Sequence, residues 1–228
     1  MIEQNVKNLL AEIPATNPFG EKVTLVAAVK TQTAEDINRA VAAGITDIGD
    51  NHVQELRNRF ELISGNPAIH FIGRLQTNKI KYILGKVDLY HSIDRLNLAE
   101  ELSRRGASSG VTSRILIQIN IGNEETKGGF RPEETEEVYE ALKRLPALKI
   151  AGLMAMLPPI EDEDKLMRLA VHMREKYDKL RAYDSEIKCL SMGMSGDWRI
   201  CVQAGSNMIR LGTAIFGNRQ YKKDAPSE

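Results

Sequence analysis

The sequence has few cysteines and no surplus of charge of either sign. Its two cysteines, Cys189 and Cys201, form no Cys-x-x-Cys pair, which excludes a disulfide framework and suits a reducing cytoplasm, where we expect the protein to be located. Lysine and arginine number 31, as do aspartate and glutamate, so no overall field favours polyanions. We therefore expect neither nucleic acid nor a membrane among its partners.

Long hydrophobic runs and metal-ligand patterns are also lacking. No run approaches the roughly 20 apolar residues of a membrane span, and residues 1–6 carry an acidic side chain and no apolar core, unlike a signal peptide. No heptad seam or large apolar stripe is evident, so we expect a monomer or a weak dimer. The histidines show no metal-ligand spacing, which argues against a zinc site. They are His52, His70, His91 and His172.

The sequence does contain a regular alternation of apolar strands and amphipathic helices. After a leading helix over 2–13, eight strands are expected over 23–30, 46–51, 68–73, 89–93, 113–120, 149–156, 188–192 and 208–215. Helices separate them, the longest over 161–183, and no composition break marks a linker. Eight such units predict a single (β/α)8 barrel domain over residues 1–228, with an extra N-terminal helix. An open doubly wound sheet is the alternative.

The first expected strand, 23–30, is a valine-rich apolar run that ends at Lys30. Lysines usually lie on helix faces with their ammonium in water, so this position is unusual. An amine in a dry pocket loses its charge readily, and a neutral amine is what a Schiff base with an aldehyde requires. The alternative is a strand-end lysine whose ammonium reaches solvent.

The last two expected strands are followed by glycines and hydroxyl side chains. Segment 191–198 has two glycines and two serines directly before a helix, with Ser195 placed as its N-cap. Arg210, Gly212 and Thr213 leave the eighth strand. The loops after strands seven and eight form the usual phosphate site of this fold. The alternative is a capped turn followed by a tight strand exit.

Together these features place a phosphate cradle beside an amine, on neighbouring strands of a closed barrel. A phosphate near an imine-forming lysine suggests pyridoxal 5'-phosphate. An aldolase acting on a phosphorylated sugar would use the same two parts.

Six segments, spread over nearly the whole chain, match a known family in the expected order. They are Ala-Val-Lys-Thr (28–31), Gly-Asp-Asn-His-Val-Gln-Glu (49–55), His-Phe-Ile-Gly-Arg-Leu-Gln-Thr-Asn-Lys (70–79), Gly-Leu-Met-Ala-Met (152–156), Leu-Ser-Met-Gly-Met-Ser-Gly-Asp (190–197) and Arg-Leu-Gly-Thr-Ala-Ile-Phe-Gly (210–217). With them the chain resembles the pyridoxal phosphate homeostasis proteins, single-domain relatives of the alanine racemase barrel. The resemblance favours the cofactor over the aldolase.

The resemblance implies a set of cofactor-binding residues. Lys30 matches the lysine that holds pyridoxal phosphate as a Schiff base. The other matching positions bind the phosphate (Ser195, Gly212 and Thr213), face the pyridine nitrogen (Arg210) and line the pocket (Asn51). Departures from the family's usual residues at Asp50, His52 and Asn207 leave this assignment intact.

We expect a cofactor carrier with little or no turnover. An arginine opposite the pyridine nitrogen opposes its protonation and weakens the ring as an electron sink. The sequence ends at Glu228, just past the last strand, which we expect to leave no room for the β-rich second domain that carries the tyrosine base of the racemases. The resemblance likewise implies cofactor supply and amino-acid and keto-acid balance, with no established reaction.

The expected partners are therefore pyridoxal phosphate and the enzymes that accept it. Lys127, in the glycine-rich loop 122–130, is a candidate for receiving the aldehyde during transfer, against the alternative of a solvated loop lysine. Two other function classes stay open: a pyridoxal-phosphate-dependent racemase or lyase, and a regulatory protein whose cofactor reports the vitamin's level to a partner.

Overall fold

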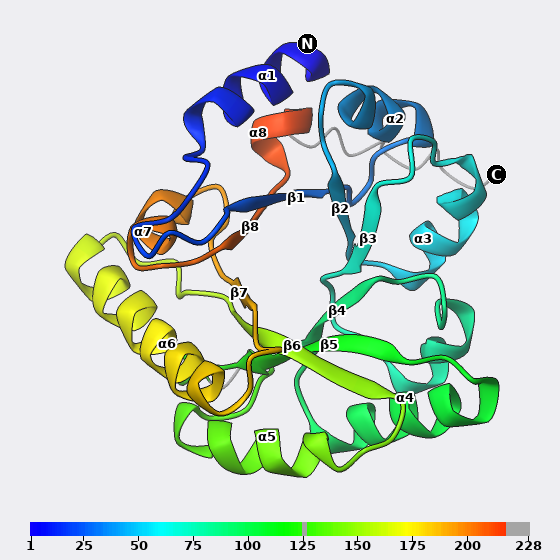
Figure 1. Cartoon of the computed structure of the whole chain (residues 1–228). Helices are drawn as coiled ribbons and strands as arrows, with labels where there is room; N and C mark the ends of the chain where they lie inside the picture. The colour runs from blue at the N-terminus through cyan, green and yellow to red at the C-terminus, as the bar shows by residue number, and fades with distance from the viewer. Residues whose placement is uncertain (125–126, 218–228) are drawn as a thin grey trace, which may run out of the picture.

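Eight parallel strands close into a barrel in sequence order, as the computed structural model shows for residues 1–124 and 127–217 (Figure 1). The strands are β1 (Thr24–Ala28), β2 (Asp47–Asp50), β3 (Ala68–Phe71), β4 (Leu89–Ile93), β5 (Ser113–Ile119), β6 (Leu148–Ala155), β7 (Cys189–Ser191) and β8 (Met208–Leu211). Because β8 pairs with β1, with Val26 opposite Arg210, the predicted (β/α)8 barrel is confirmed and the open sheet was the wrong alternative.

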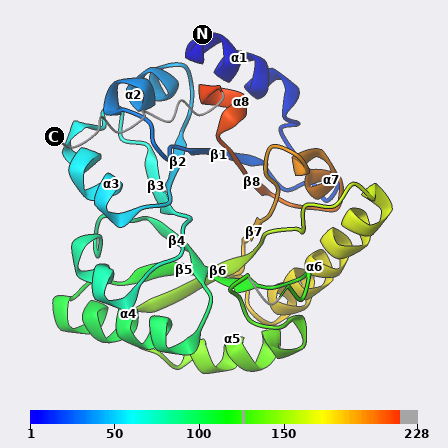
Figure 2. The same ribbon diagram turned by 180° about the vertical axis from the view of Figure 1, so that it is seen from behind.

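Helices surround the barrel as an outer ring (Figures 1 and 2). They are α1 (Ile2–Glu12), α2 (Ala34–Ala42), α3 (Val53–Arg59), α4 (Leu96–Ser109), α5 (Thr135–Lys143), α6 (Glu163–Tyr183), α7 (Trp198–Gln203) and α8 (Thr213–Phe216), with 3-10 turns η1 (Phe60–Leu62), η2 (Thr77–Tyr82) and η3 (Pro132–Glu134). The leading helix α1 packs against α2 and α8. In the described ranges, no helix is both long and apolar enough to cross a membrane.

The two strands that flank the candidate site end earlier than expected. Strand β1 ends at Ala28, and the Val29 amide adds one more ladder bond, to the Gly49 carbonyl at 2.9 Å. Strand β8 was expected to reach residue 215 but ends at Leu211. The expectation was wrong because the chain turns at Gly212. The Gly212 carbonyl accepts hydrogen bonds from the amides of Ile215 and Phe216, and these bonds begin α8.

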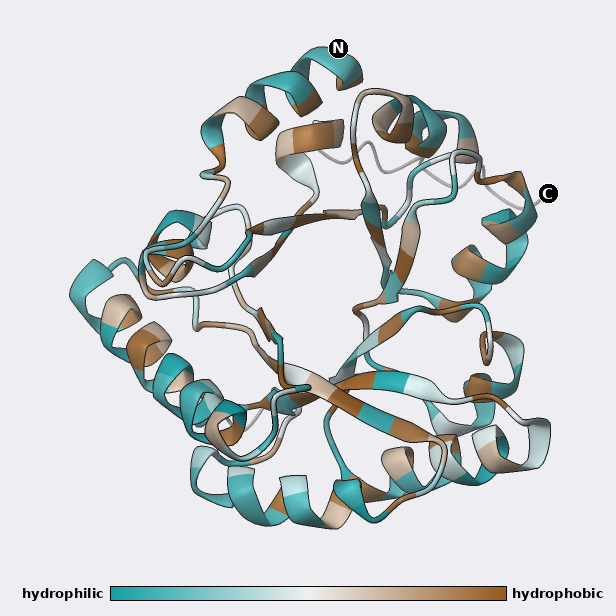
Figure 3. Ribbon diagram, in the orientation of Figure 1, coloured by the Kyte–Doolittle hydropathy of each residue, from teal (hydrophilic) through white to brown (hydrophobic). Residues whose placement is uncertain are grey.

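The barrel has two apolar cores because side chains of its strands alternate between the inside and the outside. The outer core lies between the sheet and the helices and includes Ile48, Phe71 and Ile209, all 1% exposed or less. The inner core is built by strand residues: Val26, Leu89, Leu116, Ala151, Met154 and Met208. Figure 3 shows the hydrophobic segments running along the strands, while the helices carry mixed colours.

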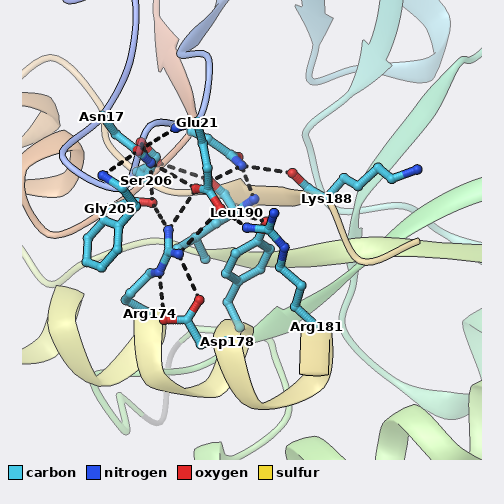
Figure 4. A network of polar contacts seen from close by, with 12 residues as sticks. Asn17, Glu21, Arg174, Asp178, Arg181, Lys188, Leu190, Gly205 and Ser206 are labelled. Atoms are coloured by element: carbon cyan, nitrogen blue, oxygen red, sulfur yellow. Dashed lines mark hydrogen bonds and ion pairs between the residues drawn. The ribbon is translucent and has the colours of Figure 1, made fainter. Parts of the chain in front are cut away.

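A polar network ties together the N-terminal rim of the barrel (Figure 4). Glu21, in the loop before β1, accepts a hydrogen bond from Arg174 of α6 at 2.7 Å and pairs with Arg181. The Asn17 amide donates to Glu21 at 2.9 Å and to the Gly205 carbonyl at 2.9 Å. The network therefore joins the loop before β1, the helix α6 and the turn before β8 at the end of the barrel opposite the candidate site.

Candidate functional site

A cavity of about 230 Å³ opens at the C-terminal ends of β1, β2, β3, β6, β7 and β8. Its lining includes every residue that the sequence analysis selected for cofactor binding. They are Lys30, Asn51, Ser195, Arg210, Gly212 and Thr213. The structure thus brings together residues that are far apart in the sequence: Lys30 and Thr213 are separated by 183 positions. Their role toward a cofactor stays a prediction.

Lys30 lies two residues beyond β1 and follows the same alternation as Val26, which faces the inner core, and Ala28, which lines the cavity. The chain turns immediately after it, because Thr31 has a φ of 66° in the left-handed region. The Glu55 carboxylate stabilises this turn by accepting the Thr31 amide at 2.9 Å. The turn holds the partly buried Lys30 side chain at the wall of the cavity.

Asp50 is a structural residue behind the wall that carries Asn51. Its side chain is 1% exposed and accepts a hydrogen bond from Arg59 at 2.5 Å, and Arg59 also donates to the Gln32 carbonyl at 2.7 Å. Burial raises the pKa of the Asp50 carboxyl, and the Arg59 guanidinium opposes this shift only in part. The buried pair links the end of β2 to α3, and Arg59 also binds the loop after β1 at Gln32, so Asn51 and Gln32 are held in fixed positions on the cavity wall.

Two hydroxyl groups meet at one side of the cavity. The Ser195 Oγ, after β7, lies 3.0 Å from the Thr213 Oγ1, at the start of α8, and both residues are exposed. Gly212 lies between Thr213 and the strand, and a Cβ on it would come within 3.1 Å of the Ala28 carbonyl oxygen. The glycine therefore allows close approach of backbone to backbone next to the two hydroxyls.

Ser195 is not the N-cap of α7, contrary to the expectation. The N-cap is Asp197, and its carboxylate accepts the Met194 amide at 2.6 Å. The Met194 carbonyl in turn accepts the amides of Asp197 and Trp198. Because this closed turn uses the aspartate rather than the serine, the Ser195 hydroxyl is left to meet Thr213.

Arg210 lines the cavity from inside the barrel and is 5% exposed. Its guanidinium donates to the Ser191 carbonyl at 3.0 Å, to the Ser191 Oγ at 2.5 Å and to the Ala155 carbonyl at 3.0 Å. Burial lowers the pKa of Arg210 to about 10, which still leaves the group charged at neutral pH. A positive charge is therefore fixed in the cavity wall, and its hydrogen-bond partners in the described part of the chain are two carbonyls and a hydroxyl rather than a carboxylate.

The donor set of the cavity suits an anionic ligand. Two cationic residues, Lys30 and Arg210, and two hydroxyls line it, and no aspartate or glutamate is present among the described residues of its lining. Hydroxyls and close backbone are common phosphate-binding elements. A primary amine can attack an aldehyde carbon. The cavity can therefore bind a phosphorylated aldehyde.

Other residues singled out by the sequence lie outside the cavity. The Lys127 amine contacts the Glu124 carboxylate at 2.6 Å and the Leu157 carbonyl at 3.3 Å, while residues 125 and 126 of its loop are outside the described part of the chain. Asn207 bonds the Leu190 amide at 2.7 Å at the opposite end of the barrel. His52 is exposed and lines a neighbouring hollow.

The lining also contains residues that the sequence analysis did not select, among them Gln32, Ile72 and Phe216. Ile72 could have been found, because it continues the inward alternation from His70 past the end of β3. Gln32 and Phe216 lie in turns whose course is set by tertiary contacts, so the sequence carried no comparable signal for them.

Sequence comparisons place the whole barrel in a known family. The profile described as alanine racemase, N-terminal domain, matches residues 2–220. A pyridoxal phosphate homeostasis protein of Aquifex aeolicus is 41% identical over 199 residues, covering 86% of this chain and 87% of the relative. The protein of the same name from Escherichia coli strain K12 is 38% identical over 207 residues, with 89% and 88% covered.

Solved structures agree with these relatives. PipY of Synechococcus elongatus PCC7942, solved with PLP bound, is 29% identical with a TM-score of 0.80, and the match covers 95% of this chain and all of PipY (100%). An alanine racemase of Clostridium difficile shares the fold, with a TM-score of 0.78 at 15% identity over 97% of this chain and 56% of the racemase. The chain therefore belongs to the family of pyridoxal phosphate homeostasis proteins, which is built on the barrel of the alanine racemase N-terminal domain.

Proposed function

We propose that this protein binds pyridoxal 5'-phosphate in the cavity at the C-terminal end of the barrel and serves the cell's supply of that cofactor. The observation that carries the proposal is the meeting of an amine, a buried arginine and a hydroxyl pair in one cavity without acidic lining among the described residues. The names of the relatives and the bound cofactor in PipY support it.

Each part of the cofactor has a matching group in the cavity. Lys30 would hold the aldehyde carbon through its amine, the Ser195 and Thr213 hydroxyls with Gly212 would hold the phosphate, and Asn51 would line the ring. Arg210 would face the pyridine nitrogen. Bound pyridoxal phosphate supplies an electron-withdrawing ring to an attached amine.

The cavity favours holding the cofactor over turning over a substrate. Arg210 only donates hydrogen bonds and keeps its charge, so it opposes protonation of a ring nitrogen that faces it. Among the described residues of the lining, Lys30 and Arg210 are the ionisable ones, and none is a tyrosine, histidine or carboxylate. Proton abstraction from a bound amino acid would therefore depend on Lys30 itself.

The partners in this proposal are enzymes that require pyridoxal phosphate and receive it from the loaded barrel. We place this exchange in the cytoplasm, which fits the free thiols of Cys189 and Cys201. In this account the Lys127 amine, occupied by Glu124 and the Leu157 carbonyl, is not the resting anchor.

The test is a transfer experiment with the full chain. The protein is loaded with pyridoxal phosphate, freed of excess cofactor and mixed with the cofactor-free form of a pyridoxal-phosphate-dependent aminotransferase. We expect recovery of aminotransferase activity and no racemisation or elimination of free amino acids by the loaded barrel. Lys30→Ala should lose loading, and Lys127→Ala should load like the wild type. Failure of the wild type to retain the cofactor, or turnover of an amino acid at enzymatic rates, would overturn the proposal.

A further inference from the structure

A chain of polar side chains crosses the barrel interior from its N-terminal rim to Arg210. The Asp47 Oδ1 of β2 lies 3.0 Å from the His70 Nε2 of β3, and the His70 Nδ1 lies 2.8 Å from the His91 Nε2 of β4. The His91 Nδ1 lies 3.1 Å from the Ser191 Oγ of β7, which accepts a hydrogen bond from the Arg210 Nη1 of β8 at 2.5 Å. Five strands thus contribute one residue each to a continuous path.

The path is shielded from water along nearly its whole length. His91 and Ser191 are 0% exposed, and His70 is 3% exposed. The Asp47 side chain is 17% exposed and lines a hollow at the N-terminal rim. Solvent therefore reaches the far end of the chain at Asp47, while the near end, Arg210, borders the cavity.

The chemistry of the two ends limits the direction of the hydrogen bonds. Arg210 can only donate, so the Ser191 Oγ is an acceptor toward it. An ionised Asp47 can only accept. Burial raises the pKa of Asp47, whereas hydrogen bonds from His70 and Thr46 lower it, and the net pKa lies below its usual value. The His70 Nε2 therefore carries a hydrogen and donates it to Asp47.

The Ser191 hydroxyl decides the direction of the bonds between these ends. Among the described residues, its Oγ makes polar contacts with His91 and Arg210 and no other side chain or carbonyl. If the His91 Nδ1 carried a hydrogen, the Ser191 hydrogen would be buried without an acceptor, which is unfavourable. Ser191 therefore donates to the His91 Nδ1, and the His91 Nε2–H donates to the His70 Nδ1.

We propose that Asp47, His70 and His91 are positioning residues for Arg210, acting through a one-directional hydrogen-bond chain that ends on the Ser191 hydroxyl. The chain turns the Ser191 hydrogen toward His91 and leaves its lone pairs for the Arg210 Nη1. The guanidinium is thereby held at the cavity wall from a point on the opposite rim of the barrel. The consequence for pyridoxal phosphate rests on the proposed function, but the direction of the chain does not.

The first test needs no cofactor. Nitrogen-15 NMR of the ligand-free protein distinguishes the two neutral tautomers of histidine from the doubly protonated ring, and His70→Gln and His91→Gln assign the signals. We expect both His70 and His91 to carry their hydrogen on Nε2. A hydrogen on the His91 Nδ1, or a doubly protonated His70, overturns the proposal.

The second test measures whether a substitution of Asp47, at the N-terminal rim, changes ligand binding in the cavity at the other end of the barrel. Asp47→Asn keeps an oxygen that can accept from His70, whereas Asp47→Leu removes it at similar volume. We expect Asp47→Leu to weaken pyridoxal phosphate binding by about twofold to thirtyfold and to shift the visible absorbance band, with Asp47→Asn close to the wild type. Glu21→Gln, at the same rim but outside the chain, should leave binding unchanged.

The outcomes separate the possible failures. Equal binding by Asp47→Leu and the wild type overturns the positioning role, and so does equal weakening by Glu21→Gln, which would reveal a general loss of stability. If Asp47→Leu does not fold, His91→Gln, which keeps one donor and one acceptor, is compared with His91→Leu in the same assay. If the wild type binds no pyridoxal phosphate, the proposed function fails while the NMR result still decides the direction of the chain.

Discussion

Lys30 and Arg210, the two cations of the cavity, are held in different ways. Lys30 is placed by the turn that follows β1, where Thr31 adopts a left-handed conformation. Arg210 is fixed by three hydrogen bonds to residues of β6 and β7 inside the barrel. The lysine is thus free to form a covalent bond with a ligand, whereas the arginine is a rigid charge. This division suits a site that holds a cofactor through one bond and orients it through another.

The hydroxyl pair predicts a test of phosphate recognition. Ser195→Ala or Thr213→Ala removes one of two hydroxyls that lie 3.0 Å apart. Each substitution should weaken binding of pyridoxal phosphate about tenfold, because a hydrogen bond to a charged group is lost. Binding of pyridoxal, which lacks the phosphate, serves as the control and should change little. The equilibrium is measured by absorbance titration, and equal weakening for both ligands would show that the hydroxyls do not hold the phosphate.

The placement of a residue in the cavity was predictable from the sequence where it depends only on the end of a strand. Arg210 has an inward position on β8, and Lys30 continues the inward alternation two residues past β1, so the pairing of these strands brings both to one cavity. The role of Ser195 as an N-cap was wrong because Asp197, two residues later, closes the turn. The chain from Asp47 to Arg210 was not foreseen, because its contacts join residues on five strands and no local spacing marks them.

At the scale of elements, the boundary between β8 and α8 shapes the cavity. The apolar segment after Leu211 has the sequence of a continued strand, yet it forms the short helix α8. Hydrophobicity alone does not separate the two, because a short apolar run is typical of a buried strand and of a buried helix alike; in α8 Ile215 is 0% exposed. The alternation of helices and strands was predictable, whereas this boundary depended on the turn at Gly212.

The pairing of β6 with β7 depends on Gly152. It has a φ of 153°, and a Cβ there would lie 1.8 Å from the Cys189 carbonyl oxygen. Gly152→Ala should therefore lower the free energy of unfolding by about 3 kcal/mol or more, because backbone must move to admit the methyl group. Gly196→Ala, where no atom lies within 4 Å of the new Cβ, is the control and should stay within about 0.5 kcal/mol. Urea unfolding measures both, and similar values for the two variants would contradict this account.

The network around Glu21 predicts a pH dependence for the docking of α6. Burial raises the pKa of Glu21, but hydrogen bonds from Arg174 and Asn17 together with the charges of Arg174 and Arg181 lower it by more, so the net pKa is below the ordinary 4.5. A lowered pKa in the folded state contributes stability that is present above the unfolded pKa and is lost as the pH falls through the folded pKa.

Glu21→Gln should therefore be less stable than the wild type at neutral pH, and the difference should shrink as the pH falls below about 4.5. Urea unfolding at a series of pH values tests this. A difference that stays constant over the range would mean that the carboxylate charge has no part in holding α6.

At the scale of the whole molecule, the two ends of the described chain meet. Strand β8 closes the sheet on β1, and α1 packs against α8. Because no part of the barrel can leave without breaking this closure, we predict one cooperative unfolding unit. The single Trp198, 6% exposed on α7, reports tertiary structure by fluorescence, and far-ultraviolet circular dichroism reports the helices. The two urea transitions should coincide, and separate midpoints would indicate more than one domain.

The measurement that tests the central claim most directly is a mass map of the protein after incubation with pyridoxal phosphate and reduction with borohydride. Reduction makes the bond between the cofactor and its lysine permanent. The account predicts the added pyridoxyl phosphate mass on the peptide that contains Lys30, and its loss in Lys30→Ala. An adduct on the peptide that contains Lys127 instead, or no stable adduct at all, would contradict the claim that this cavity holds the cofactor through Lys30.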